Sequence, residues 1–346
     1  MDSRRVGPMG LLELPLSEAN DPRIATFKKH GIISELCQMD IENIIPHGVM
    51  LLKRFDDQGA KGTIVLSRTY AHGDMFLAAS VISALKKRYP ENDIIFHTMP
   101  KMEPLIRHHP DAKIITGDEA LKDALRLAGV YINLDDVAEL YEEHNPGSGM
   151  NRIEIFCHHL GLEPETLCPN YYITPDEIDS ADTLLQHHQR PYIGISPSTM
   201  RKEKSWPLER WEVFTQAIQE QTGGTVFVYD DKPVLNVEGD HVAKLIHKPF
   251  RTVGSIAYHM DIFVTQDSLW SHWAAALGVK QILLSSCTDG ALLAKGYPKV
   301  TVIQRDWECS PCWYKFDNPA CLHGGYPACL QDVSENEVVT KVLEAL

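Results

Sequence analysis

The chain has 346 residues, a formal charge of −14 at pH 7, 44% hydrophobic residues and 23% charged residues. This length suits two α/β domains of roughly 150 residues each, with an appendage. No apolar run approaches the ~20 residues that a membrane helix needs, and the first residues lack the apolar core of a secretory signal. We therefore expect a folded, cytoplasmic protein, and the acidic charge argues against nucleic acid as a partner.

Residues 1–60 are predicted to form an accessory segment. Two short helical patterns, 22–29 and 32–45, come before a β-prone run at 49–55. That run could pair as a hairpin with the next β-prone run, 63–66. We expect this segment to have an accessory or assembly role.

From residue 61 onward, strand-like and helix-like patterns alternate. The pattern predicts strands at 63–66, 93–97, 113–115 and 130–134, and a helix at 75–88 that ends before Pro90. Such an alternation is typical of βαβ units and of a parallel sheet with helices on both faces. We expect a Rossmann-like domain over residues 61–180.

The same alternation starts again near residue 186. It predicts strands at 192–196, 225–229, 262–265 and 281–285, with helices at 206–221, 252–260 and 268–277. The helix at 206–221 is predicted to open at Trp206-Pro207, because proline is favourable at the first helical position. A second doubly wound domain is therefore expected over 186–305, followed by a cysteine-rich finger at 306–330 and a closing helix at 331–346.

Polar residues follow the predicted strand at 262–265. Asp267, Ser268 and His272 lie where that strand turns into a helix. Ligands of open α/β sheets bind at the carboxyl ends of strands, and a helix N-terminus favours an anion. The sequence therefore indicates an anion site here, although Asp267 or Ser268 could simply cap the helix.

Two further loops carry candidate residues. In the first domain Gly73 would let the backbone approach a ligand, and Asp74 is either a helix cap or a general base facing an interdomain cleft. In the second domain Arg201, Lys202 and Lys204 precede a helix. Their charges suit a departing diphosphate, or they belong to an ordinary solvated loop.

Four cysteines are clustered near the carboxyl terminus. Cys309, Cys312, Cys321 and Cys329 form a C-x2-C-x8-C-x7-C pattern. Four thiolates suit a tetrahedral structural site for zinc or iron. Disulfides and free thiols are the alternatives.

The three loops together resemble glycosyltransferase family 9, the heptosyltransferases, whose GT-B fold has two facing Rossmann-like domains. The resemblance is carried by three groups of residues: Gly73-Asp74 with 84–90; Lys204 with Trp206-Pro207 and Trp211; and Asp267-Ser268 with His272 and 274–278. Leu269 stands where the family pattern has a glycine after Asp-Ser, and the bulky Trp270 follows it.

The resemblance implies a role for each candidate residue. Asp74 would be the base that deprotonates an acceptor hydroxyl, with His72 as the alternative, and Lys204 would hold the departing diphosphate. Asp267, Ser268 and His272 would bind the phosphates and adjoining sugar of the donor, Gly73 would also lie at the donor, and Asp230 or Asp231 would meet the ribose or base. It implies inversion at the anomeric carbon without a catalytic metal or cofactor.

The cysteines are similar to those of the autotransporter heptosyltransferases, a group whose cysteine finger holds iron. This similarity implies a structural metal and a homo-oligomer.

The leading hypothesis is an inverting glycosyltransferase that moves a sugar, from ADP-heptose or a relative, to a saccharide or protein hydroxyl. One alternative is a phage-type transferase that glycosylates modified DNA bases, against which the charge of −14 counts. The other is a nonenzymatic, metal-stapled assembly protein on a transferase fold. Asp74, Lys204 and His272 count against it, because a degenerate site would be expected to lose at least one of them.

Overall fold

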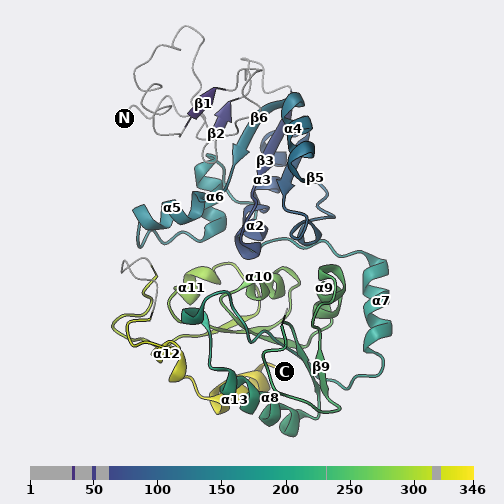
Figure 1. Ribbon diagram of the computed structural model, residues 1–346, viewed down its shortest axis with the longest axis vertical. Coiled ribbons are helices and arrows are strands. Elements are labelled where there is room, and N and C mark those ends of the chain that lie inside the picture. Colours follow the sequence, from purple (N-terminus) through teal and green to yellow (C-terminus); the bar gives the residue numbers. More distant parts are fainter. Residues whose placement is uncertain (1–32, 36–48, 52–61, 231, 314–320) are drawn as a thin grey trace. The chain divides into compact units, whose positions relative to one another are not determined.

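The computed structural model describes residues 33–35, 49–51, 62–230, 232–313 and 321–346. The chain divides into two compact units, unit 1 over Met1–Leu167 and unit 2 over Cys168–Leu346 (Figure 1). Each unit is built around its own, mainly parallel sheet with helices packed on it. The predicted α/β fold class, with two Rossmann-like units, is confirmed.

In unit 1 the described strands lie in the order β1-β2-β6-β3-β4-β5. β2 and β6 are antiparallel, and the other neighbouring pairs are parallel. The strands are β1 (Ile33–Glu35), β2 (Val49–Leu51), β3 (Thr63–Ser67), β4 (Ile94–Thr98), β5 (Lys113–Thr116) and β6 (Ala128–Asn133). The helices are α2 (His72–Ala78), α3 (Val81–Arg88), the 3-10 turn η2 (Glu103–Leu105), α4 (Asp118–Leu127), α5 (Val137–His144) and α6 (Arg152–His159).

Two predictions for the accessory segment are wrong. Residues 33–35 form strand β1 instead of part of a helix over 32–45. β2 pairs with β1 and β6, and β6 separates it from β3, so the expected hairpin with 63–66 does not form. The strand β6 is largely buried and pairs with a strand on each side, β2 on one and β3 on the other. The edge of β3 that a hairpin with β2 would need is therefore occupied by β6. The predicted helix at 22–29, with the rest of 1–32, 36–48 and 52–61, lies outside the described residues.

In unit 2 all neighbouring strands in the sheet are parallel, in the order β12-β11-β10-β7-β8-β9. The strands are β7 (Tyr192–Ile195), β8 (Thr225–Val228), β9 (Val242–Lys244), β10 (Ile262–Gln266), β11 (Gln281–Leu284) and β12 (Val300–Ile303). Counted along the chain from the β9 edge, this is the order 3-2-1-4-5-6 of dinucleotide-binding sheets. The order reverses between β7 and β10, which is the switch point where such sheets bind ligands.

The helices of unit 2 begin and end where the sequence provides caps. α7 starts with a capping box between Thr174 and Glu177, and α8 ends at Gly223, whose φ of 67° suits glycine. Pro207 was predicted to be the first helical residue of α8, but it is the N-cap, and the helix starts one position later at Leu208. The helices are α7 (Pro175–Leu185), the 3-10 turn η3 (Lys202–Lys204), α8 (Leu208–Thr222), α9 (Phe250–Tyr258), α10 (Leu269–Ala276), α11 (Gly290–Leu293), α12 (Ala328–Gln331) and α13 (Glu335–Ala345).

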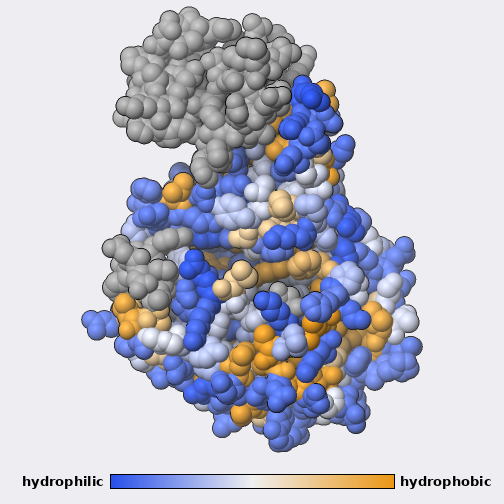
Figure 2. Space-filling model, viewed as in Figure 1, coloured by the Kyte–Doolittle hydropathy of each residue, from blue (hydrophilic) through white to orange (hydrophobic). Residues whose placement is uncertain are grey.

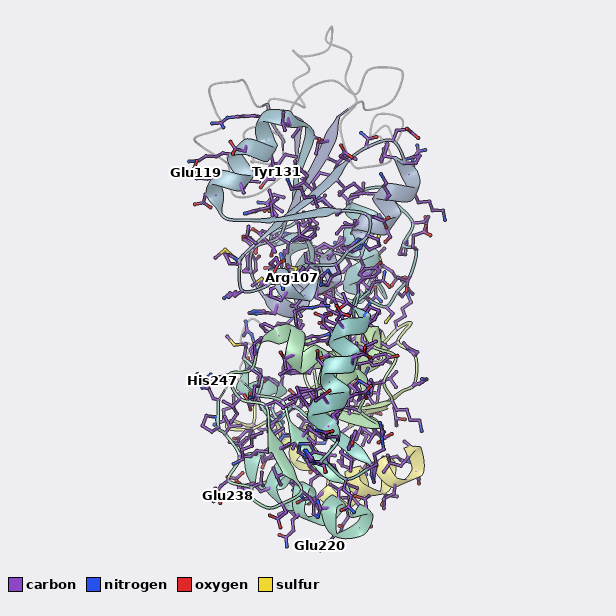
Figure 3. All side chains as sticks on the ribbon, turned by 90° about the vertical axis from the view of Figure 1, so that its right-hand side faces the viewer. Arg107, Glu119, Tyr131, Glu220, Glu238 and His247 are labelled. Atoms are coloured by element: carbon purple, nitrogen blue, oxygen red, sulfur yellow. The ribbon has the colours of Figure 1, made fainter. Side chains whose placement is uncertain are left out.

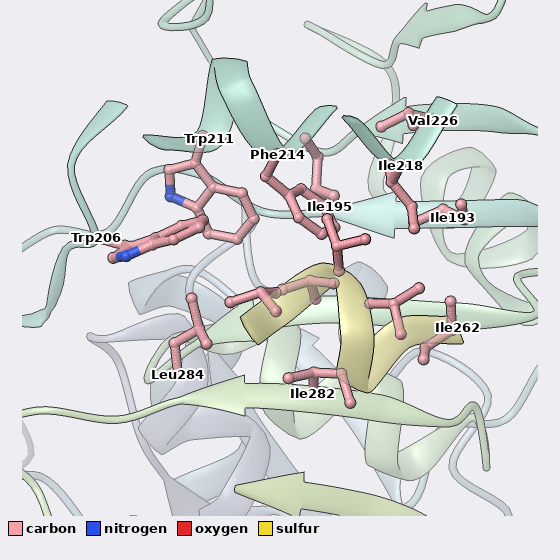
Figure 4. Packing of buried hydrophobic residues seen from close by; sticks show 14 of the residues in the cluster. Ile193, Ile195, Trp206, Trp211, Phe214, Ile218, Val226, Ile262, Ile282 and Leu284 are labelled. Carbon is pink, nitrogen blue, oxygen red and sulfur yellow. The ribbon is translucent and has the colours of Figure 1, made fainter. Parts of the chain in front are cut away.

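One face of the unit 2 sheet is covered by α8 and α13, and the core between them is rich in aromatic rings (Figure 4). Trp206 and Trp211 meet edge to face, with centroids 5.1 Å apart. Phe214 packs against both of them and is fully buried. Edge-to-face contacts add to the burial of these rings, so the start of α8 is tightly fixed.

Phe214→Ala is expected to lower the free energy of unfolding of unit 2 by about 4 kcal/mol, because it leaves a cavity among rigid rings. The melting temperature should fall by about 10 °C in calorimetry. Val213→Ala is the matched control on the same helix, since Val213 is 53% exposed. Equal shifts for both variants would contradict this account of the core.

A partly buried ion pair joins α7 to α9. Arg251 Nε donates to Glu177 Oε1 at 2.6 Å, and Arg251 Nη2 donates to the carbonyl of Tyr172 at 2.8 Å. Burial alone would raise the pKa of Glu177, but hydrogen bonds from Arg251 and from the Thr174 backbone outweigh it and hold the pKa at about 2. The carboxylate therefore stabilises the fold above its ordinary pKa of 4.5, and this contribution is lost as the pH falls towards 2.

Glu177→Gln is expected to lower the melting temperature by about 5 °C at pH 7, which corresponds to about 2 kcal/mol after allowance for solvent screening. The difference from the parent should shrink between pH 5 and pH 2. Glu209→Gln, at an exposed position on α8, should change little at any pH. A pH-independent deficit in Glu177→Gln would refute the electrostatic explanation.

The surfaces of the units are mostly polar. On the face of unit 2 seen in Figure 2, hydrophobic residues gather around α13, α8 and β9 and are surrounded by hydrophilic ones. In unit 1, Glu119 lies on the outer side of α4, whereas Tyr131 lies inside on β6, where burial raises its pKa (Figure 3). Within the described parts of the chain, no helix is long and apolar enough to cross a membrane.

Candidate functional site

The candidate residues of unit 2 lie at the switch point of its sheet. Asp267 directly follows β10, and Lys204 lies in the loop that follows β7. β7 and β10 are neighbours in the sheet, so their two loops lie side by side at its carboxyl edge. The crevice at such an edge is the usual ligand site of this fold.

Lys204 and Asp267 form a shielded ion pair. Lys204 Nζ lies 2.6 Å from Asp267 Oδ2, and Asp267 is only 9% exposed. Thr288 Oγ1 donates a second hydrogen bond to Asp267 Oδ2 at 2.8 Å. Burial would raise the pKa of Asp267, but the charge and hydrogen bond of Lys204 lower it, with smaller contributions from His272 and Thr288. Asp267 is therefore ionised and holds the ammonium group at the sheet edge.

Ser268 and His272 occupy the first turn of α10. Ser268 is the N-cap, and its side chain accepts from the Trp270 N–H at 3.3 Å, so the capping interpretation holds for Ser268. His272 Nδ1 is 2.5 Å from the hydroxyl of the buried Tyr297. Its ring lies close enough to Asp267 to lower the pKa of that carboxyl. The turn thus combines a helix dipole with an oriented imidazole, an arrangement able to receive an anion.

Gln266 was missed by the sequence analysis. Its Nε2 donates to the carbonyls of Ser196 and Pro197 at 3.2 and 3.0 Å, and its Oε1 accepts from the Trp206 N–H. This buried amide fixes both ends of the loop that carries Lys204. A polar residue at the end of an apolar strand was the signal that could have revealed it.

Trp270, which follows the Leu269 that replaces the glycine of the family pattern, packs within an aromatic group. Its indole stacks on Trp273 at 5.0 Å and on Phe263 at 6.2 Å, and meets Tyr229 at 4.8 Å. Trp273 and Phe263 are fully buried, and Trp270 is half-buried against them. The bulk of this side chain is therefore taken up largely by packing in the layer of α10 and β10.

Asp230 follows β8 at the same edge of the sheet. Ser198 Oγ donates to its Oδ1 at 2.5 Å, which links the loop after β8 to the loop after β7. The alternative residue, Asp231, lies outside the described residues.

In unit 1, His72, Gly73 and Asp74 form the first turn of α2, which follows β3. In this sheet β4 and β5 lie on one side of β3 and β6 lies on the other, so the strand order reverses at β3. These residues therefore also lie at a switch point. The N-cap Ala71 has a φ of 54°, an uncommon value for a residue with a side chain. Such backbone strain is concentrated at functional sites in proteins.

Asp74 belongs to a cluster of charges that the sequence did not reveal. Its side chain is 20% exposed, forms an ion pair with Arg152, and lies 3.8 Å from Arg68 Nη2. Glu142 binds Arg152 at 2.7 Å, and Glu139 binds Arg68 at 2.6 Å. Burial opposes the charge of Arg152, but Asp74 and the neighbouring carboxylates raise its pKa well above the ordinary value. These arginines fix the orientation of the Asp74 carboxylate.

The four clustered cysteines line one small cavity of about 20 Å³, together with Cys287 and His323. Burial, assisted by the neighbouring thiols, raises the pKa of Cys329 to about 11. Among the residues that the structure describes, no group of three or more His, Cys, Asp or Glu side chains has a metal-binding arrangement. The structure thus brings together the predicted ligands Cys309, Cys312, Cys321 and Cys329 without confirming the finger.

A depression of about 740 Å³ lies at the opposite edge of the unit 2 sheet. It is lined by Arg190, Lys280 and Lys299, which precede β7, β11 and β12. None of the predicted site residues lines it. The fold rule for ligand binding favours the edge with Lys204 and Asp267 instead.

Each of the two Rossmann-like units has polar side chains gathered at its switch point, which is where α/β proteins of this class place their ligand sites. The model of glycosyltransferase family 9 (heptosyltransferase) matches residues 150–323, which is half of the chain. The chain belongs to glycosyltransferase family 9, and it is a glycosyltransferase. The resemblance stated from the sequence is confirmed.

Solved structures show the same fold. ADP-heptose LPS heptosyltransferase II from E. coli has 16% identity and a TM-score of 0.61 and matches over 82% of this chain and 98% of its own. A family 9 glycosyltransferase from Veillonella parvula has 13% identity, a TM-score of 0.63 and coverages of 82% and 97%. The iron-containing dodecameric glycosyltransferase TibC from enterotoxigenic E. coli has 13% identity, a TM-score of 0.60 and coverages of 82% and 76%. No curated protein matches the sequence significantly.

Proposed function

We propose that the chain is an inverting heptosyltransferase that moves the sugar of ADP-heptose, or of a related nucleotide sugar, to a saccharide or protein hydroxyl. The observation that carries this proposal is the ion pair of Lys204 and Asp267 at the switch point of a Rossmann-like sheet. Similar folds support the donor: one solved structure is ADP-heptose LPS heptosyltransferase II, and another is E. coli heptosyltransferase WaaC with an ADP-2-deoxy-2-fluoro heptose, at 15% identity.

In unit 2, Lys204 would bind the diphosphate, which gains negative charge as it leaves. Asp267 would orient Lys204 and accept a hydrogen bond from a sugar hydroxyl, because a carboxylate facing the phosphates would be repelled. Ser268 and the backbone at the start of α10 would receive a phosphate, and His272 would donate to it. Asp230 or Asp231 would meet the ribose or base.

In unit 1, Asp74 would act as the general base, with Gly73 giving the ligand access to the backbone. The acceptor oxygen attacks the anomeric carbon while its proton passes to the Asp74 carboxylate. The bond from the anomeric carbon to the diphosphate oxygen breaks, and its electron pair leaves with ADP. Attack opposite to the leaving group inverts the configuration. His72, two residues before Asp74, is the alternative base.

A donor screen tests the proposal. We expect ADP-heptose, or one related nucleotide sugar, to raise the melting temperature of the protein, and Lys204→Ala to weaken this effect. Transfer is followed by mass spectrometry of candidate saccharide and peptide acceptors. The proposal is overturned if no nucleotide sugar stabilises the parent and no product forms.

We also propose that Cys309, Cys312, Cys321 and Cys329 hold a structural zinc or iron ion. Four thiols around one cavity provide the donor set that both metals accept. TibC is described as iron-containing and dodecameric, and the proposal extends to self-association of this chain.

Protein purified without chelator is expected to contain about one zinc or iron ion per chain by elemental analysis. The double variant Cys309→Ser/Cys312→Ser should lose this metal, whereas Cys168→Ser, outside the cluster, should keep it. Parent protein that contains no metal would contradict the proposal. Self-association is tested by measuring the molecular mass in solution of the parent and of the double variant.

A further inference from the structure

We propose that Trp313 is a positioning residue that couples the cysteine cluster to Lys204. Trp313 directly follows Cys312 in the chain, and its ring lies at the candidate donor site. The inference rests on the proposed function, because it assigns Lys204 to the donor diphosphate. By this inference the cysteine cluster has a second role besides stabilising the fold, because it helps to position the Lys204 ammonium that would bind the donor.

Two cations converge on the indole of Trp313. Lys204 Nζ lies 4.6 Å from the ring centroid, and the guanidinium carbon of Arg201 lies 5.0 Å from it. Tryptophan is the side chain whose face attracts cations most strongly. Lysine has a long, flexible stem that does not fix its own charge in place. The ammonium of Lys204 is therefore held between the Asp267 carboxylate and the Trp313 ring.

The backbone of the same segment is tied to the loop after β11. The Trp313 N–H donates to the carbonyl of Cys287 at 2.8 Å, and Ser310 Oγ donates to the carbonyl of Ser286 at 2.8 Å. Thr288, next along this loop, donates to Asp267. The contacts close into a ring that runs from Trp313 to Lys204, Asp267, Thr288 and back through Cys287.

This ring of contacts explains how the cluster can act at a distance. Cys287 also lines the cavity of the four clustered cysteines, so the cavity touches the ring of contacts at Cys287 and is lined as well by Cys312, the residue before Trp313. A metal held by the cysteines would fix Cys312, and with it the indole beside it. Without that anchor the indole would be less well held, and Lys204 would lose one of the two groups that place its charge.

Calorimetric titration with ADP, on protein that carries its metal, tests the coupling. Trp313→Leu keeps an apolar side chain but removes the π face, and we expect ADP to bind about five-fold more weakly. Trp313→Phe keeps a π face and should stay within about two-fold of the parent. Tyr326→Leu is the matched control: Tyr326 makes the same kind of contact with the neighbouring Lys202, at 5.0 Å, and does not line the cysteine cavity. Its ADP affinity should not change.

A double-mutant cycle shows whether the Trp313 indole acts through Lys204. In a Lys204→Met background, Trp313→Leu should cause no further loss of ADP affinity. Chelating the metal from the parent should weaken ADP binding as Trp313→Leu does, and should add nothing in Trp313→Leu. The coupling is overturned by an equal loss in both backgrounds, or by full ADP affinity after chelation.

A second measurement does not depend on nucleotide binding. Acetylation of Lys204 by acetic anhydride, followed by peptide mass spectrometry, should be faster in Trp313→Leu than in Tyr326→Leu, because the Lys204 ammonium is less well held. If the parent binds no nucleotide, the proposed function fails while this rate still tests the position of Lys204. Equal rates of Lys204 acetylation in the two variants would contradict the inference about Trp313.

Discussion

Lys204→Ala is expected to lower kcat/KM for sugar transfer by about 100- to 1000-fold. The ammonium is the cation that the structure pairs with Asp267 at the switch point, where a departing diphosphate would gain charge. Removing the ammonium also leaves the shielded Asp267 carboxylate without its counter-charge, and this negative charge disfavours binding of the donor diphosphate nearby. The measurement is steady-state transfer from the donor found in the screen, with ADP affinity determined in parallel.

Lys202→Ala is the matched control in the same loop. Lys202 is exposed and lies 5.0 Å from the ring of Tyr326, away from the pair that Lys204 forms with Asp267. Its activity should stay within about two-fold of the parent, as expected for a surface cation. Lys204→Arg should recover part of the affinity for ADP but not its full activity, because arginine places its charge differently. A Lys204→Ala protein as active as Lys202→Ala would exclude Lys204 from the mechanism.

Asp74→Asn is expected to lower kcat by about 10²- to 10⁴-fold with little change in ADP affinity. Asparagine has the size of aspartate and can still accept a hydrogen bond from Arg152, but it cannot take a proton from the acceptor. The base acts only on the acceptor, so the loss should fall on kcat, which single-turnover kinetics separate from donor binding.

Two controls belong to this second prediction. Glu142→Gln changes another carboxylate bound to Arg152, at 2.7 Å, and should reduce kcat far less if Asp74 is the base. His72→Ala tests the alternative base on the same turn of α2. Loss of turnover in His72→Ala, together with near-parent turnover in Asp74→Asn, would transfer the role of base to His72.

Most of the fold could be predicted because its signals are local. The strands β7, β8, β10 and β11 are short, mainly apolar runs separated mostly by helices, so the sequence indicated a doubly wound sheet. The strands β9, which contains Lys244, and β12 were not predicted. Pairing partners are not local, which is why β2 was assigned to β3 instead of β6. The break between α2 and α3 at residues 79–80 was also hidden, since the apolar residues continue through it without a proline or glycine.

The candidate site was predictable to the extent that it depends on position after a strand. Asp267 and Ser268 follow β10 directly, and Lys204 lies in a loop with an evident excess of positive charge. Thr288 and Trp313 come from segments far along the chain, and only the folded unit brings them to Asp267 and Lys204. Arg152 is likewise 78 residues from Asp74. No spacing in the sequence could indicate these contacts, and the roles of Asp74, Lys204, Asp267, Ser268 and His272 stay predictions.

The stacked indoles of Trp270 and Trp273 lie in the first two turns of α10, with their planes 17° apart. Two indoles this close share their electronic excitation, so their ultraviolet circular dichroism depends on the geometry of this helix start. A small molecule that seats against Ser268 and shifts Trp270 would change that signal. The chain therefore carries a pair of chromophores that is sensitive to the start of α10, one residue after the position where the family pattern has a glycine, and no added label is needed to use it.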